Sequence, residues 1–101
     1  MAHKFYAKVY RYQNEVILAA CDPEVYGKTF ENELMHLEVD SAFYGDELVV
    51  DEDIKSLLNS ATIANLVGTK IVKHAIEIGL VDPENIIEIE GVPHAQIARM
   101  L

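Results

Sequence analysis

The chain has 101 residues, half of them hydrophobic and a quarter charged, and its net charge is -9. This length fits one domain spanning residues 1–101, and the apolar content excludes a disordered chain. No apolar run reaches the roughly 18 residues of a transmembrane helix, and the start lacks the apolar core of a secretory signal. Because the single cysteine, Cys21, cannot form an internal disulfide, we expect a reducing, cytoplasmic compartment and no membrane contact.

Acidic residues are concentrated in one part of the chain. Residues 15–53 hold twelve acids and a single base, whereas residues 54–81 hold three lysines and a single acid. The simplest interpretation of the acidic stretch is a solubilising surface, and the functional one is a surface complementary to a basic protein. The excess of acid disfavours general binding to a nucleic-acid backbone. Only a local patch of Lys70, Lys73 and His74 is left for such a contact.

Alternation with a period of two predicts strands in the first half of the chain. Apolar and polar side chains alternate over residues 5–12, and a Gln13–Asn14 turn connects them to an apolar partner strand over 15–21. Pro23 has no N–H donor, so this strand ends at the Asp22–Pro23 step. The next predicted elements are a connector at 24–33, a third strand at 34–40, a loop at 41–46 and a short strand at 47–50.

A helical half follows from Asp51, a predicted N-cap. Apolar or small residues then recur at alternating steps of three and four as far as Gly79, which is a natural residue to follow a helix. We predict two consecutive helices over 51–59 and 61–78. Gly68 inside the second helix costs about 1 kcal/mol relative to alanine, which we attribute to the close approach of another backbone.

The last part of the chain predicts a second hairpin. Residues 86–90 alternate as a strand, residues 91–93 form a turn, and residues 94–100 return as a strand. The predicted fold class is therefore α+β. Its antiparallel sheet combines the N-terminal hairpin, the third strand and the C-terminal hairpin, packed against the two helices.

Two side chains could support nucleophilic chemistry. Cys21 lies at a strand end, and His94 could serve as its base if the C-terminal turn lies nearby. Asp22 has the wrong charge to lower the pKa of a thiol. The alternative is an inert, buried cysteine. The four histidines and Cys21 match no metal-ligand spacing, and no cofactor motif is present, so we expect neither a metal nor a cofactor.

Other candidates are more typical of binding than of catalysis. Pro93 makes a rigid turn before His94, and an imidazole and the Gln96 amide two residues apart share one face of a strand. Such a pair can bind a base edge, a peptide backbone or a polar ligand, or can satisfy local backbone groups. Phe43 and Tyr44 in a loop could anchor a partner, or Phe43 could fill the core while Tyr44 lies on the surface. Asn65 is expected to bond a loop backbone.

Five segments carry the most distinctive residues. They are Ala19-Ala20-Cys21-Asp22, Tyr26-Gly27-Lys28-Thr29-Phe30, Phe43-Tyr44-Gly45, Ala64-Asn65-Leu66-Val67-Gly68 and Gly91-Val92-Pro93-His94-Ala95-Gln96. In this order, over nearly the whole chain, they resemble the archaeal domain-of-unknown-function family numbered 424. The resemblance implies a short, stand-alone archaeal cytoplasmic protein with a single α+β domain, and it supplies no catalytic residues. The family pattern implies a second glycine directly after Gly45, and Asp46 at that position departs from it.

These observations give three functional hypotheses. The first is a non-catalytic binding or adaptor module with a protein partner, in translation or other archaeal information processing. Its candidate contacts are Cys21, Asp22, Phe43, Tyr44, Gly45, Asn65, Pro93, His94 and Gln96. The alternatives are a small hydrolase or transferase that uses Cys21, Asp22 or His94, and a nucleic-acid binder that uses Lys70 and Lys73. Self-association is a further expectation for so small a domain with an apolar helical face.

Overall fold

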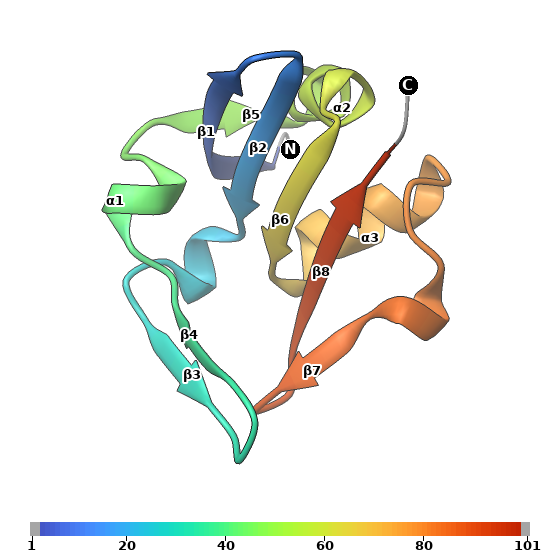
Figure 1. The fold of residues 1–101 in the computed structure, drawn as a ribbon. Helices are drawn as coiled ribbons and strands as arrows, with labels where there is room; N and C mark the ends of the chain where they lie inside the picture. The colour runs from blue at the N-terminus through green and yellow to red at the C-terminus, as the bar shows by residue number, and fades with distance from the viewer. Residues whose placement is uncertain (1–2, 100–101) are drawn as a thin grey trace.

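The computed structural model describes residues 3–99, which form a six-stranded sheet, a separate two-stranded hairpin and three α-helices (Figure 1). In chain order the elements are β1 (Lys4–Tyr12), β2 (Glu15–Cys21), the 3-10 turn η1 (Pro23–Val25), β3 (Thr29–Glu31), β4 (His36–Glu38), α1 (Ser41–Tyr44), β5 (Leu48–Val50), α2 (Asp51–Ser60), β6 (Ile63–Val67), α3 (Thr69–Glu77), the 3-10 turn η2 (Pro83–Asn85), β7 (Ile87–Ile89) and β8 (Val92–Ala98). None of the helices in residues 3–99 is long and apolar enough to cross a membrane.

The six strands lie in the order β5-β1-β2-β6-β8-β7. Neighbouring strands are antiparallel except β2 and β6, which are parallel in the middle of the sheet. Two-residue turns close both hairpins of this sheet. Gln13 has a positive φ in the first turn, and Glu90 and Gly91 both do in the second, as a type I′ turn requires. The sheet is therefore mixed rather than antiparallel throughout as predicted, because the long connection that ends with α2 returns the chain to lie parallel to β2.

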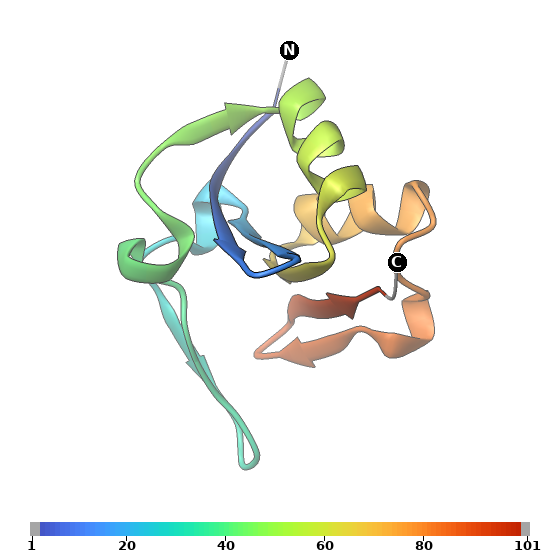
Figure 2. The same cartoon turned by 45° about the horizontal axis from the view of Figure 1, so that its top comes forward.

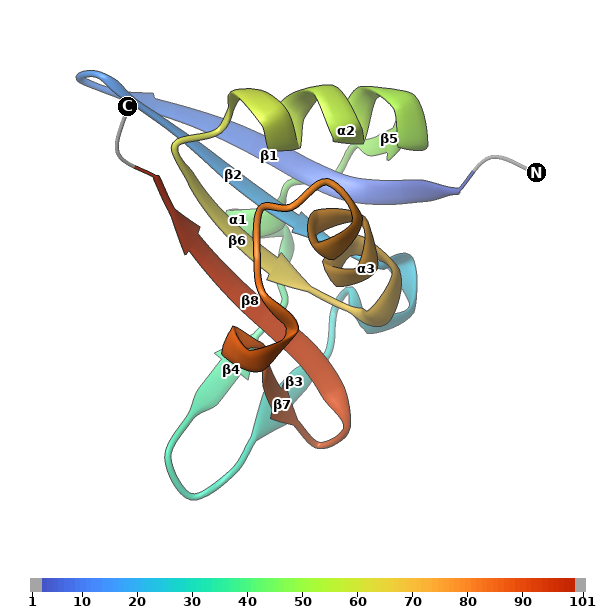
Figure 3. The same ribbon diagram turned by 90° about the vertical axis from the view of Figure 1, so that its right-hand side faces the viewer.

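The two faces of the sheet are covered differently, because successive side chains of a strand point to opposite sides. One face packs against α2 and α3, where Leu18 and Leu66 meet Ile54, Leu58 and Ile71 in the larger buried cluster. The other face is covered only in part, by η1, the β3–β4 hairpin and α1. Figure 3 shows α2 and α3 together on one side of the long strands, with α1 behind them.

The α+β fold class, the N-terminal hairpin and the short strand before Asp51 are confirmed. The prediction of a helix over 61–78 is wrong in its first half, because residues 63–67 form β6. The apolar and small residues of this segment also fit a helical spacing, which is why a helix was predicted. Ala64 and Leu66 are both buried on the helix-covered face, and their spacing of two is that of a strand. The two longer helices are consequently separated by a strand rather than consecutive.

Several further boundaries differ from the predictions. The predicted third strand is reduced to β4, which pairs with β3 outside the main sheet, so the connector and the loop around it contain β3 and α1. The turn predicted at 91–93 lies instead at Glu90 and Gly91, because Val92 and Pro93 belong to β8. β8 ends at Ala98, and the last residue of the strand predicted over 94–100 lies outside the described residues. Asp51 is the first residue of α2 rather than its N-cap, which is Val50. Gly79 does follow α3 with a positive φ, as predicted.

Candidate functional site

The partly covered face of the sheet has a covered half and an open half, and the rows of paired residues across the strands show where one half ends and the other begins. In the covered half, Cys21, Val67 and His94 lie in one row across β2, β6 and β8. The open half begins with the next row, where Asn65 is directly opposite Gln96. We call this half the open sheet face. Its half-buried or exposed residues are Lys8, Tyr10, Tyr12, Glu15, Ile17, Ile63, Asn65, Gln96 and Ala98.

A buried histidine at the edge of the covered half contacts the first amide of the open sheet face. His94 is 3 % exposed, and its Nε2 lies 2.9 Å from Oδ1 of Asn65. Because an amide oxygen only accepts, this assignment places the imidazole proton on Nε2. Nδ1 is then a buried acceptor with no partner among the described residues. Burial lowers the pKa of His94, so the ring is neutral at physiological pH. The contact fixes the orientation of the Asn65 amide.

The Asn65 amide and the Gln96 side chain are next to each other at the surface. Asn65 uses its oxygen for His94, so its amino group points to the open sheet face beside the exposed Gln96. Tyr12, at the far end of the face, is 67 % exposed. The ring of Tyr10 stacks on Phe43 at 5.7 Å, and its hydroxyl donates to the Phe43 carbonyl at 2.6 Å. The face thus combines aromatic, aliphatic and amide groups with two charged side chains, Lys8 and Glu15.

The proposed pairing of Cys21 with His94 is not formed. Val67 lies between them in the row, so their strands are about 10 Å apart, twice the usual spacing of neighbouring strands. Burial, with a smaller effect from the Asp22 carboxylate, raises the pKa of Cys21 to about 12. The thiol therefore stays protonated at neutral pH, and a protonated thiol is a poor nucleophile. Cys21 fits the inert, buried interpretation.

Asp22 has a structural partner far along the chain. Its two carboxylate oxygens accept from the backbone N–H groups of Lys70 and Ile71 at 2.8 and 2.9 Å, which caps the first turn of α3. Burial raises the pKa of Asp22, while these two hydrogen bonds act to lower it. Gly68 leaves room for this side chain, because a Cβ there would overlap Asp22. The close approach that we expected at Gly68 is therefore made by a carboxylate rather than by a backbone.

The aromatic pair at α1 is divided between core and surface. Tyr44 is 1 % exposed and packs in the same buried cluster as Cys21, whereas Phe43 is 37 % exposed. The interpretation in which Phe43 fills the core and Tyr44 lies on the surface is wrong. Gly45 ends α1 with a positive φ, and its carbonyl accepts from the Tyr26 hydroxyl at 2.7 Å. Pro93 is held within β8, where its carbonyl accepts from the Gly68 N–H at 2.9 Å.

The local basic patch predicted on the helical half carries little net charge. Lys70 pairs with Glu24 at 3.2 Å, and His74 pairs with Asp51 at 3.0 Å. Lys73 has no ion-pair partner among residues 3–99. Over the same part of the chain, no three His, Cys, Asp or Glu side chains are arranged to hold a metal ion. The structure thus brings together His94, Asn65 and Gln96, and leaves the other candidates in separate places.

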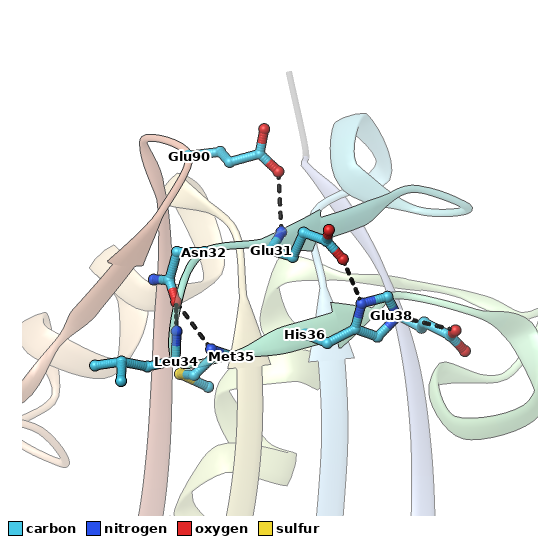
Figure 4. A network of polar contacts seen from close by, with 7 residues as sticks. All are labelled: Glu31, Asn32, Leu34, Met35, His36, Glu38 and Glu90. Carbon is cyan, nitrogen blue, oxygen red and sulfur yellow. Dashed lines mark hydrogen bonds and ion pairs between the residues drawn. The ribbon is translucent and has the colours of Figure 1, made fainter.

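Sequence reasoning missed the aromatic part of the face and the hairpin beside it. The signal for Tyr10 and Tyr12 was available, since both alternate with the buried Ala7 and belong to the opposite side of β1. In the β3–β4 hairpin only β4 had such a signal, within the strand predicted over 34–40, whereas β3 has three residues and none. Its polar contacts, in which His36 lies between Glu31 and Glu38, are shown in Figure 4.

The neutral state of His94 predicts a pH dependence. Its ordinary pKa is 6.5 and its folded pKa is lower, so below about pH 6.5 the unfolded chain binds a proton that the folded chain does not. Stability should therefore fall as the pH drops through this range, by at most about 1.4 kcal/mol per pH unit from this group. Urea unfolding of the wild type and His94→Leu at pH 7.5 and pH 5.5 isolates the effect. The stability difference should shrink at the lower pH, and a constant difference would contradict the neutral ring.

The fold and its site define a class of small α+β domains, with a six-stranded mixed sheet and a histidine-supported amide on its open face. Residues 10–100 match the family described as a protein of unknown function, DUF424, and the chain belongs to that family. The fold is similar to the crystal structure of an uncharacterized conserved protein from Methanopyrus kandleri, with a TM-score of 0.77 and 21% sequence identity. This similarity covers 97% of the present chain and 96% of the other. Comparison with curated proteins gives no match.

Proposed function

We propose that this protein is a non-catalytic adaptor of archaeal information processing, in the cytoplasm, that binds a protein partner through its open sheet face. The observation that carries the proposal is the Asn65 amide, oriented by the buried His94 at 2.9 Å beside the exposed Gln96. Holding a neutral histidine in the sheet with an unpartnered Nδ1 is costly. A fixed amide at a contact surface offsets that cost, because a preorganised group loses less entropy on binding.

The charge of the chain favours a basic partner. The segment from Glu15 to Asp53 contains most of the acid, and it includes the β3–β4 hairpin that flanks the covered half of the same face. The open sheet face itself carries one charge of each sign, the exposed Lys8 in the row of Asn65 and Gln96 and the half-buried Glu15 opposite Tyr12. An acidic hairpin beside a contact surface without net charge steers a basic protein toward that surface.

Two exposed amides allow a matched test of this proposal. A photo-crosslinking amino acid at Tyr12, compared with one at Lys55 on α2, identifies the partner in an archaeal lysate, and that partner is then purified. Gln96→Arg should weaken its binding at least about tenfold by titration calorimetry, because it places a charge in the contact. Asn59→Arg, which changes an exposed amide of α2, should not. Equal affinities of the two variants would overturn the proposal, as would an association rate that is independent of salt.

A further inference from the structure

The β3–β4 hairpin displays an apolar side chain at a rigid tip. Leu34 is 92 % exposed, more than the other large hydrophobic residues described. Oδ1 of Asn32 accepts from the backbone N–H groups of Leu34 and Met35, both at 2.8 Å, and the Asn32 N–H donates to the Met35 carbonyl at 2.9 Å. We call residues 32–35 the hairpin tip. Its backbone is ordered by hydrogen bonds, so Leu34 is presented in one place.

The stem of the hairpin is acidic and fixed to the body of the protein. His36 lies 2.7 Å from Glu31 of β3 and 3.2 Å from Glu38 of its own strand, and the contact with Glu31 joins the two strands (Figure 4). Both carboxylates raise the pKa of His36. The Glu31 N–H donates to the Glu90 carboxylate at 3.0 Å and so anchors the stem to the β7–β8 turn. In Figure 2 the hairpin tip extends away from the rest of the chain. The tip is therefore available to another molecule.

An apolar groove without an occupant lies on the helical side of the protein. It has a volume of about 430 Å³ between α3 and the segment from η2 to β8. We call it the α3 groove, and its lining is mostly apolar, with Val72, Lys73, Ile76, Pro83, Ile86 and Pro93 among its residues. Glu88 also lines it. No residue of the β3–β4 hairpin does, so the tip of the same chain does not fill the groove.

The two features share apolar character and offer one pair of opposite charges. The hairpin tip offers a leucine with an acidic neighbour, Glu33, and the α3 groove offers an apolar lining with Lys73 on its α3 side and Glu88 on its β7 side. We infer that the hairpin tip of one copy of this chain docks into the α3 groove of a second copy, with Leu34 in the apolar lining and Glu33 beside Lys73. This contact is separate from the open sheet face and goes beyond the proposed function.

Burial of Leu34 is the main driving force of the contact. It removes an almost fully exposed side chain from water, and the ordered tip loses little entropy when it docks. The net charge of -9 on each copy opposes association at long range. At 0.15 M salt this repulsion is screened beyond about 8 Å, whereas the pairing of Glu33 with Lys73 acts at close range. Association is therefore expected at physiological salt and high protein concentration.

Sedimentation of the purified protein tests the inference. At 0.15 M salt the weight-average mass should rise above the monomer value as concentration approaches about 1 mM. Leu34→Ser should raise the dissociation constant at least about tenfold. Leu48→Ser, which changes another exposed leucine away from both features, should leave it unchanged. A constant monomer mass for the wild type would overturn the inference, and so would Leu34→Ser associating as the wild type does.

Two further variants locate the contact. Lys73→Glu should weaken association, and Glu33→Lys on the same chain should restore it by exchanging the charges. Mixing Leu34→Cys protein with Lys73→Cys protein under mild oxidation should give a disulfide-linked pair, whereas Leu34→Cys with Lys55→Cys should not. The native Cys21 is buried, with a pKa of about 12, and does not compete. Association without the charge-swap rescue and without the specific disulfide would place the interface elsewhere and overturn the inference.

Discussion

Gly68→Ala should destabilise the protein by about 4 kcal/mol or more, which approaches the whole stability of a domain of this size. Gly68 has a φ of 124° and a ψ of 153°, a conformation that only glycine adopts without strain of about 1–3 kcal/mol. A Cβ at this position would also lie 2.7 Å from Oδ2 of Asp22 and overlap the carboxyl carbon. The Asp22 carboxylate must then move, and both of its hydrogen bonds to the first turn of α3 are lost. Each charge-assisted bond contributes about 1.5–3 kcal/mol.

Urea unfolding of three further variants separates the clash from the backbone strain. Gly27→Ala is the matched control, since Gly27 also has a positive φ but nothing lies within 4 Å of its Cβ position, so it should cost only about 1–3 kcal/mol. Asp22→Ala removes the helix cap alone. In the double variant, the cost of Gly68→Ala should fall by at least about 1 kcal/mol because the clash and the cap are already gone. Strict additivity would show that Gly68 and Asp22 act independently and would contradict this account.

Local pattern predicted the parts of the fold that depend on nearest neighbours. The N-terminal hairpin and the end of α3 at Gly79 both follow from short-range rules, namely alternation and a glycine with positive φ. The segment 61–68 could not be assigned in this way. Ala61, Ala64 and Gly68 satisfy a helical spacing, and the strand conformation is imposed by pairing with β2 on one side and β8 on the other. Tertiary pairing overrode the local periodicity there.

The candidate site was predicted only in its residue types. Gln96 and His94 were expected to share a face, and they do, since both belong to β8 at a spacing of two. Asn65 was assigned to a helix and to a loop contact, so its bond to His94 across 29 positions was not foreseen. The same holds for Asp22, whose partners Lys70 and Ile71 are 48 and 49 positions away. Contacts at such separation depend on strand order, which local pattern does not contain.

Tyr44→Ala should destabilise the protein by about 3–5 kcal/mol, whereas Phe43→Ala should cost about 1 kcal/mol. Tyr44 is 1 % exposed in the smaller buried cluster, so its truncation leaves a cavity that the surrounding side chains fill only in part. Phe43 is 37 % exposed, and its truncation removes the stacking on Tyr10 at 5.7 Å and the edge-to-face contact with Tyr44 at 5.0 Å. Tyr44→Phe keeps the packed ring and should cost less than about 1.5 kcal/mol. Thermal or urea unfolding measures the stability of all three variants. An equal loss of stability in Phe43→Ala and Tyr44→Ala would contradict the placement of Tyr44 in the core and Phe43 at the surface.

This division decides how binding experiments on the aromatic pair are interpreted. Because Tyr44 holds α1 against the sheet near Cys21, a loss of partner binding in Tyr44→Ala would report on unfolding rather than on a contact. Phe43 and Tyr10 form the edge of the open sheet face, so Phe43→Ala can change binding while the protein stays folded. We therefore expect Phe43→Ala to weaken partner binding, with a loss of binding free energy larger than its loss of unfolding free energy. An adaptor that binds through this face requires that result, and an equal loss for both quantities would place the contact elsewhere.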